Sequence, residues 1–343
     1  MNTLKFEILL KDVPLNILIN RADSIGDVVL ALPIAKYLKE FFPAVKIGFL
    51  GRNYTRSVIE ACENVDEFIE YEDFLNKPVK ICGEVIQCIL HVWPNKLIAK
   101  RAKKLKIPLR IGTTNRLFHW STCNKLIRLS RKNSYLHEAK LNLKLLEAFR
   151  INKNFSLEEI RESFGLTKIE PLESSYKNLI DKNKFNLIIH PKSQGNAREW
   201  SLSNFAALIN LLDREKYKIF ISGTEKEGKV LKDFLALIGN KATNITGKMK
   251  LSQFISFINS CDGLIANSTG PLHITAALGK NTYGIFAPMW PINDVRWGPL
   301  GKNAKVFVIE KNCNDCRKNR IECKCIQQVD PFWIKAQLDK DSS

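Results

Sequence analysis

Two stretches of the chain combine small and polar residues in patterns that suit phosphate binding and proton transfer. In the later one, residues 264–266 predict a short buried strand, a polar Asn-Ser-Thr-Gly-Pro turn follows, and residues 272–278 predict an apolar helix. Backbone N–H groups at such a helix start favour an anion. Ser268 and Thr269 add hydroxyl donors, and Pro271 suits the first helical turn. The pattern predicts a phosphate site, although ordinary capped turns also look like this.

The earlier stretch has the same strand, turn and helix order. Residues 16–20 predict a strand, residues 21–27 a turn that contains glycine, and residues 28–42 a helix with apolar residues at helical spacing. Asp27 stands at or near the start of this helix. A carboxylate there could accept a proton from a hydroxyl, which is a poor nucleophile until its proton is taken. It could equally cap the helix and meet its dipole.

Residues 267–279, Asn-Ser-Thr-Gly-Pro-Leu-His-Ile-Thr-Ala-Ala-Leu-Gly, resemble the signature of the heptosyltransferase family, glycosyltransferase family 9. Members of that family build the inner core of bacterial lipopolysaccharide. Ser-Ile-Gly-Asp at residues 24–27, the His-Pro loop at residues 190–200 and Gly-x-x-x-Glu at residues 223–227 match the same family in the same order. The resemblance covers most of the chain, from about residue 16 to about residue 334.

The resemblance implies two catalytic residues. Asp27 corresponds to the aspartate that is taken as the general base on the acceptor hydroxyl, and Ser24 and Gly26 of the same motif are expected at the acceptor site. Arg198 corresponds to a basic residue that contacts the donor diphosphate, where some members have lysine. A cation there would neutralise the charge that builds on the leaving nucleotide, and arginine can bind phosphate through two parallel hydrogen bonds. A surface ion pair is the alternative for Arg198.

The donor site is expected to bind a nucleotide sugar, with ADP-heptose as the first candidate. Its expected residues are Lys192, Ser193, Glu227, Ser268, Thr269, Gly270, Pro271 and His273. Glu227 would accept hydroxyl hydrogen bonds from the ribose, with Glu225 as its rival and a plain helix start as the alternative. Ser268 stands where many members have an aspartate that contacts donor sugar hydroxyls, so this chain departs from the pattern there. His273 is expected to be a structural helix residue rather than an acid or base.

The acceptor site is placed in a basic and aromatic segment at residues 113–134, around Arg116, His119 and Arg128. Arginine mixed with aromatic residues suits sugar and phosphate contacts, and would also suit a nucleic acid. A solvated surface is an equal alternative for each of these residues taken singly.

Charge is concentrated in one part of the chain. The formal net charge is +18, and residues 77–153 contain 18 Lys and Arg against three acids, which is +15 of the total. Such a field attracts a polyanion, whether a nucleic acid, an anionic membrane or a phosphorylated glycolipid. A generally basic protein with solvated lysines is the alternative.

Length and periodicity predict two α/β domains. The 343 residues fit two cores of about 150 residues each. Strands expected at residues 45–50, 65–71, 85–90, 185–190, 217–222 and 281–286 alternate with helices expected at residues 53–62, 96–106, 137–149, 203–212 and 251–259. The polar residues 154–183 predict a linker. We therefore expect the GT-B arrangement that the resemblance implies, with two Rossmann-like parallel-sheet domains facing a central cleft. We expect an acceptor-binding domain at residues 1–165 and a nucleotide-sugar-binding domain at residues 166–329. A C-terminal helix in residues 330–343 is expected to pack back toward the first domain.

Four cysteines cluster near the C-terminus as C-x2-C-x6-C-x-C, at Cys313, Cys316, Cys323 and Cys325. C-x2-C suits zinc, but C-x-C matches structural zinc sites poorly, so free thiols or a local disulfide stay open. Cys62, Cys82, Cys88, Cys123 and Cys261 are scattered and predict free thiols, mostly buried.

Together these features predict an inverting, metal-independent glycosyltransferase that needs no cofactor besides its nucleotide-sugar donor. The expected acceptor is a Kdo- or heptose-bearing lipid A core. The N-terminus lacks the order of a signal peptide and no apolar run reaches about 18 residues, so we expect a cytoplasmic protein that contacts the anionic inner membrane peripherally. A basic nucleic-acid-binding protein and an inactive sugar-binding relative are the alternatives, and the intact Ser-Ile-Gly-Asp and Arg-Glu-Trp sequences speak against the second.

Overall fold

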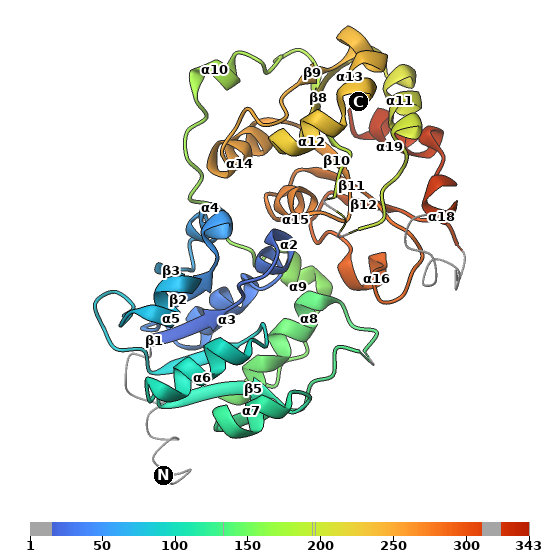
Figure 1. Cartoon of the computed structure of the whole chain (residues 1–343). Helices are drawn as coiled ribbons and strands as arrows, with labels where there is room; N and C mark the ends of the chain where they lie inside the picture. Colours follow the sequence, from blue (N-terminus) through green and yellow to red (C-terminus); the bar gives the residue numbers. More distant parts are fainter. Residues whose placement is uncertain (1–15, 133, 194, 196, 311–323, 343) are drawn as a thin grey trace. The chain divides into compact units, whose positions relative to one another are not determined.

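A computed structural model describes residues 16–132, 134–193, 195, 197–310 and 324–342. The chain divides into two compact units, Met1–Lys168 and Ile169–Ser343 (Figure 1). Each unit contains one six-stranded sheet in which every strand pair is parallel. The expectation of two Rossmann-like α/β domains is confirmed.

The first sheet has the strand order β3-β2-β1-β4-β5-β6. Its strands are β1 (Asn16–Asn20), β2 (Lys46–Gly51), β3 (Glu67–Glu70), β4 (Cys88–His91), β5 (Leu109–Thr113) and β6 (Lys125–Ile127). Every residue of β1 and of β4 is buried, as expected for parallel strands covered on both faces. Because the strand order reverses between β1 and β4, the segments that follow these two strands diverge at the carboxyl edge of the sheet.

Helices and 3-10 turns connect these strands. They are α2 (Ile25–Val29), α3 (Pro33–Phe41), η1 (Asn53–Thr55), α4 (Arg56–Glu60), α5 (Tyr71–Asn76), α6 (Lys96–Lys104), α7 (Leu117–Thr122), α8 (Glu138–Leu143), η2 (Lys144–Phe149) and α9 (Leu157–Arg161). The core of this unit packs Leu18, Leu50 and Ile89 of the sheet against Phe74 and Ile98 of the helices.

The second sheet has the order β12-β11-β10-β7-β8-β9, which repeats the connectivity of the first. Its strands are β7 (Phe185–His190), β8 (Tyr217–Ile221), β9 (Thr243–Asn244), β10 (Gly263–Asn267), β11 (Asn281–Ile285) and β12 (Ala304–Phe307). Its helices are α10 (Ser174–Lys177), α11 (Leu202–Leu211), α12 (Glu225–Val230), α13 (Lys232–Ile238), η3 (Gly239–Lys241), α14 (Leu251–Ser260), α15 (Gly270–Ala277), α16 (Asp294–Trp297), α18 (Lys324–Gln327) and α19 (Pro331–Asp341). The reversal lies between β7 and β10.

Three expected elements differ in the structure. The single helix expected at residues 28–42 is two helices, α2 and α3, because Pro33 has no N–H and begins a new helix. The helix expected at residues 137–149 changes to a 3-10 helix at Lys144. The expected linker contains α9, whose Ser156 and Glu159 form a capping box, and α10.

The C-terminal helix α19 belongs to the second unit and packs on α11. The Tyr217 hydroxyl donates to Asp339 Oδ1 at 3.0 Å, and the Tyr283 hydroxyl donates to Asp341 Oδ2 at 2.8 Å. These bonds hold α19 to β8 and β11 of its own unit. The expected return of this helix to the first domain stays a prediction.

Candidate active site

In the first unit, the residues after β1 and after β4 meet at the reversal point of the strand order. Asn20, the last residue of β1, is buried, and its side-chain amide donates to the Trp93 carbonyl at 3.0 Å. The Trp93 amide donates in return to the Asn20 carbonyl at 2.9 Å. This exchange joins the ends of two strands at the position where open α/β sheets bind ligands.

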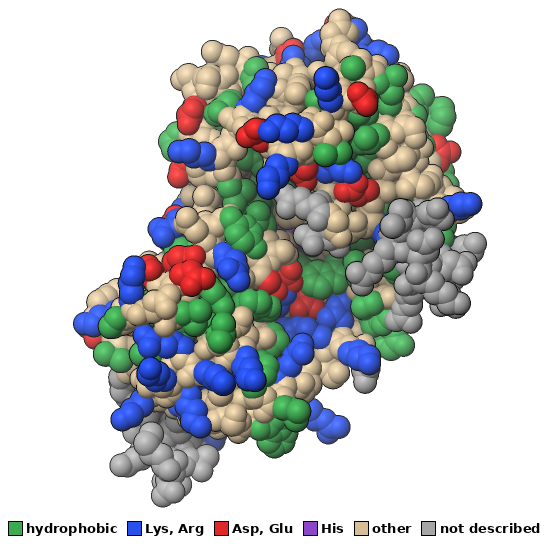
Figure 2. Space-filling view, viewed as in Figure 1, with side chains coloured by type: hydrophobic (Ala, Val, Ile, Leu, Met, Phe, Trp, Pro, Cys, Tyr) green, Lys and Arg blue, Asp and Glu red, His purple; other side chains and the backbone are tan. Residues whose placement is uncertain are grey.

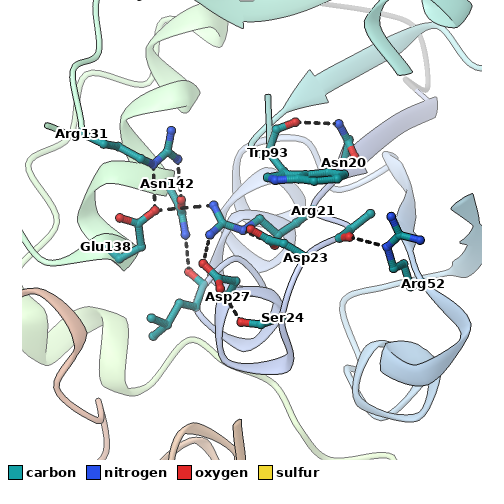
Figure 3. Close-up of polar contacts among 12 residues, drawn as sticks. Asn20, Arg21, Asp23, Ser24, Asp27, Arg52, Trp93, Arg131, Glu138 and Asn142 are labelled. Carbon is teal, nitrogen blue, oxygen red and sulfur yellow. Dashed lines mark hydrogen bonds and ion pairs between the residues drawn. The ribbon is translucent and has the colours of Figure 1, made fainter. Parts of the chain in front are cut away.

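Asp27 lies at this edge, in the first turn of α2 (Figure 3). Arg21 Nη2 donates to Asp27 Oδ1, and the Ser24 hydroxyl donates to Asp27 Oδ2. Ser24 holds the N-cap position of α2, but its side chain makes no cap hydrogen bond. Asp27 therefore does not act as the N-cap residue. Its carboxylate has a donor on each oxygen and a side chain that is 17% exposed, so it remains accessible to solvent.

Arg21 is the centre of the polar contacts around Asp27. It follows β1 directly, is 4% exposed, and forms ion pairs with Asp23, Asp27 and Glu138 (Figure 3). Glu138 is 1% exposed and also accepts from Arg131 Nε at 2.8 Å. Burial raises the pKa of Asp23 and is only partly opposed by the charge of Arg21. Three carboxylates therefore surround one guanidinium.

The structure separates the three residues expected at the acceptor site. Arg116, the N-cap residue of α7, and Arg128, just after β6, are exposed. His119 is fully buried, and its Nδ1 accepts from the Thr113 amide at 2.9 Å. The ring lies against Gly112, where a Cβ would come within 2.7 Å of it. His119 is thus a buried residue packed over β5 rather than part of an exposed surface, and its contact with an acceptor stays a prediction.

In the second unit, Asn267 joins the two strands that flank the reversal point. It is the last residue of β10 and fully buried. Its side-chain amide donates to the Pro191 carbonyl at 2.9 Å, and its Oδ1 accepts from the Trp200 amide at 2.9 Å. These bonds hold both ends of the loop that contains Lys192, Ser193 and Arg198.

Glu199 organises the inside of this loop. It forms an ion pair with Lys192, and its Oε1 accepts from the Ser193 amide at 2.8 Å and from the Ser193 hydroxyl at 3.0 Å. Ser193 also donates to the Ala197 carbonyl at 3.0 Å and is buried. Lys192 and Ser193 thus shape the loop. The Ser193 hydroxyl already has protein acceptors for its one proton, whereas the Lys192 ammonium carries three N–H donors and can contact a phosphate while it is paired with Glu199.

Arg198 lies in the same loop and is partly exposed. Its Nη2 lies 4.0 Å from the sulfur of Met289, which follows β11. The guanidinium thus extends from the loop after β7 toward the segment after β11.

The start of α15 follows β10 directly and is partly exposed from Ser268 to Pro271. Thr269 is the N-cap residue, with a proline in the first helical turn, but its side chain makes no cap hydrogen bond. Its Oγ1 is buried and lacks a hydrogen-bond partner among the described residues. An uncapped helix start with an unsatisfied hydroxyl suits a bound anion. His273 lies one turn further into α15 and is buried, which fits a structural residue.

Glu227 forms a capping box with Thr224 at the start of α12, which confirms the helix-start interpretation. Its Oε2 accepts from the Thr224 amide at 2.6 Å and from the Thr224 hydroxyl at 2.9 Å. Its Oε1 is buried and has no hydrogen-bond partner in the described part of the chain, so one acceptor oxygen remains for a ligand. The rival Glu225 is largely exposed and pairs with Lys229 at 3.0 Å.

Three residues that organise these sites, Arg21, Glu138 and Asn267, are not among the site residues predicted from the sequence. Arg21 and Asn267 carry a local signal, because they stand at or just after the carboxyl ends of buried parallel strands, where open α/β sheets bind ligands. Glu138 follows a histidine that caps α8, and its burial depends on Arg21 and Arg131.

The cysteine cluster falls mostly outside the described residues. Cys313, Cys316 and Cys323 lie there, while Cys325 is buried in α18. Within the described ranges, no group of three or more His, Cys, Asp or Glu side chains could hold a metal ion. The same residues contain no helix that is long and apolar enough to cross a membrane.

Two Rossmann-like units of this kind are the GT-B fold, which solved glycosyltransferases of similar structure share. A family model, glycosyltransferase family 9 (heptosyltransferase), matches residues 99–327, which is more than half of the chain. The chain therefore belongs to glycosyltransferase family 9, as the motifs predicted.

Similar proteins agree with this assignment. The lipopolysaccharide core heptosyltransferase OpsX of Haemophilus influenzae is 20% identical over 315 residues, which cover 87% of this chain and 86% of that protein. The structure of E. coli ADP-heptose lipopolysaccharide heptosyltransferase II is similar with a TM-score of 0.74 at 17% identity, over 96% of this chain and 98% of that one. The iron-containing dodecameric glycosyltransferase TibC of enterotoxigenic E. coli has a TM-score of 0.55 at 9% identity, over 96% of this chain and 77% of that one.

Proposed function

We propose that this glycosyltransferase transfers a heptose or a related sugar from an ADP-sugar to the inner core of lipopolysaccharide, with inversion at the anomeric carbon. The observation that carries the proposal is the pairing, within one family 9 chain, of an accessible Asp27 carboxylate in one unit with the uncapped start of α15 in the other. A base and an anion site are the two parts that direct sugar transfer from a diphosphate needs.

In the proposed reaction, Asp27 accepts the proton of the acceptor hydroxyl as that oxygen attacks the anomeric carbon. The bond between this carbon and the diphosphate oxygen breaks in the same step, and ADP leaves with its electron pair. One displacement inverts the configuration. Arg198 and the N-terminus of α15 would neutralise the charge on the diphosphate, and Glu227 Oε1 would accept a hydrogen bond from the ribose. The cleft in which the two substrates meet stays a prediction.

The reaction is proposed to need no metal and no cofactor. Helix N-termini and arginine can supply the positive charge that a cation supplies elsewhere. TibC is iron-containing, so metal independence is a point to be tested for this chain rather than carried over from relatives.

We also propose that the first unit contacts an anionic bilayer through α6 and α7, while Arg116 and Arg128 contact the acceptor. Residues 85–137 contain no Asp or Glu and 12 Lys and Arg. Exposed Leu97, Leu117 and Trp120 lie on these two helices, and Leu117 is 90% exposed. Figure 2 shows Lys and Arg side chains gathered where α6 lies in Figure 1. Aliphatic side chains among lysines suit insertion between lipids better than binding to a nucleic acid.

The experiment that tests the proposed activity is a panel of nucleotide sugars with ADP-heptose first. Thermal shift identifies the donor, because a ligand at about 100 times its Kd stabilises the native state by about 2.7 kcal/mol. Transfer to truncated lipopolysaccharide is then followed by mass spectrometry. We expect ADP-heptose to give both the shift and the product. A shift and product with a UDP-sugar alone would overturn the proposed donor.

A further inference from the structure

Arg21 is placed to control the residue that the proposed function uses as its base. Its guanidinium is buried directly after β1, and each of its three nitrogen atoms approaches a different carboxylate. Nε lies 2.8 Å from Asp23 Oδ1, Nη2 binds Asp27 Oδ1, and Nη1 lies 3.5 Å from Glu138 Oε1 (Figure 3). A planar guanidinium can contact three acids at once, which a lysine ammonium on its flexible chain cannot reproduce.

One of the two carboxylates that share Arg21 with Asp27 comes from a distant part of the chain. Glu138 lies at the start of α8 and is 1% exposed. Arg131 supports it with a bond of 2.8 Å from Nε, and also donates from Nη2 to Asn142 Oδ1 at 2.9 Å. The Asn142 amide in turn donates to the Leu30 carbonyl, just after α2, at 3.0 Å. Helix α8 and the Asp27 helix are therefore tied together twice, once through Arg21 and once through Asn142.

Several neighbouring elements contribute charged groups around Asp27. Asp23 and Arg21 belong to its own loop, and Glu138 and Arg131 come from the α8 side. On the β2 side, Arg52 Nε donates to the Ala22 carbonyl at 3.2 Å and the Tyr54 hydroxyl donates to the Asp23 carbonyl, so both act on the backbone. The described charged side chains around Asp27 thus include the carboxylates of Asp23 and Glu138 and the guanidinium groups of Arg21 and Arg131.

A general base must be held in a fixed direction and must also remain able to accept a proton. An arginine that holds a carboxylate fixes its direction but also stabilises its anion, which makes it a weaker proton acceptor. Other carboxylates that contact the same arginine reduce this stabilisation of the anion, while the arginine still fixes the direction of the first carboxylate. We infer that Arg21 is the positioning residue for Asp27, and that Glu138 and Asp23 keep Asp27 basic by sharing the charge of Arg21.

The inference predicts shifts of opposite sign in the protonation of Asp27. Glu138→Gln leaves more of the Arg21 charge for Asp27 and removes a nearby anion, so Asp27 should titrate at lower pH. Arg21→Lys cannot serve all three acids, so Asp27 should titrate at higher pH. Arg131→Gln should also move it to higher pH, because Glu138 then draws more on Arg21 and one cation is lost.

The experiment follows the ¹³C carboxyl signal of Asp27 through a pH titration of the full chain without substrate, and the acid limb of kcat/KM for the same variants. Asp27→Asn assigns the signal. Asp66→Asn is the control, since Asp66 forms an ion pair with Lys39 at 2.9 Å in the same unit but lies outside the Arg21 contacts. It should lower stability without moving the titration of Asp27.

The expected result is a titration of Asp27 that moves down in Glu138→Gln and up in Arg21→Lys. Shifts in the same direction, or none, would overturn the inference. If Glu138→Gln does not fold, Arg131→Gln takes its place, since the wild-type Arg131 side chain is 20% exposed. The titration of Asp27 should then move to higher pH. An unmoved titration of Asp27 in this variant would count against the sharing of Arg21. Only the role of Asp27 as the base in this inference rests on the proposed function. If Asp27→Asn keeps transfer activity, the base assignment fails while the NMR titration still decides the sharing.

Discussion

At the scale of single residues, the two candidate sites differ in how they leave a ligand something to bind. Asp27 has a protein donor on each carboxylate oxygen and still keeps part of its side chain exposed. Thr269 Oγ1 and Glu227 Oε1 are buried polar atoms for which the described residues provide no partner. A buried polar atom without a partner is costly, so a ligand that satisfies it gains binding energy.

Replacing Asp27 tests the base directly. Asp27→Asn keeps the size of the side chain and removes its ability to take a proton, so transfer should fall about 10²- to 10⁴-fold. The thermal shift given by the donor should persist, because the proposed donor residues belong to the second unit. Ser24→Ala serves as a milder comparison that removes one contact to Asp27. Wild-type transfer rates in Asp27→Asn would show that the carboxylate is structural.

At the scale of elements, both sheets place polar side chains at the carboxyl ends of buried strands. His91 ends β4 and His190 ends β7, while His119 packs over β5. Burial lowers the pKa of all three, to about 3 for His91, where the nearby His119 and Arg110 add to the effect. These histidines are therefore neutral in the folded chain at pH values where the unfolded chain binds protons.

The sign of the resulting pH dependence follows from these lowered pKa values. Their stabilising contribution is complete above the unfolded value of about 6.5 and is lost as the pH falls below it. Urea unfolding between about pH 7 and about pH 5.5 should show the free energy of unfolding falling with decreasing pH, and the contribution of His91 should approach about 1.4 kcal/mol per pH unit. His91→Gln should lower that slope by roughly one histidine's share. An unchanged slope in this variant would show that His91 does not have a lowered pKa in the folded chain.

The prediction about the membrane is that helices α6 and α7 contact an anionic bilayer. In the variant Leu97→Ser with Leu117→Ser, two exposed apolar side chains are lost, so binding to vesicles that contain phosphatidylglycerol should weaken at least about tenfold. Vesicle flotation measures this. The matched control is Val230→Ser with Leu237→Ser, which changes exposed apolar residues of the second unit. Equal binding by all three proteins, or tighter binding to RNA than to vesicles, would count against this surface.

At the scale of the whole molecule, the chain repeats one strand order in two units and gives each a different set of side chains. The first unit has a carboxylate at its reversal point, and the second has an uncapped helix start and an arginine loop. Family membership shows a glycosyltransferase, whereas its donor, its stereochemistry and its metal requirement are proposals to be tested.

The metal requirement is to be measured on the complete chain, which contains the cluster Cys313, Cys316, Cys323 and Cys325. We expect full transfer activity after dialysis against EDTA and o-phenanthroline, and after replacement of Cys313, Cys316 and Cys323 by serine. Elemental analysis of protein purified without chelator is the companion measurement. Activity that is lost on chelation and restored by iron or zinc would show that the proposal of metal independence is wrong.

The sequence by itself determined the elements and the motif residues of both sites. Strand, turn and helix at Asp27 and at Thr269 follow from local spacing, because apolar periodicity and turn chemistry act over a few residues. Short elements were harder to predict, since β6 has three residues and α9 lies in a polar stretch.

Only the tertiary structure decided which side chains meet. Packing of α8 brings Glu138 to Arg21, and the strand order brings Pro191 to Asn267. Packing over Gly112 buries His119, which its sequence neighbours had suggested for the acceptor. The physical reason is that burial and charge pairing depend on contacts between segments far apart in the chain, which local spacing does not specify.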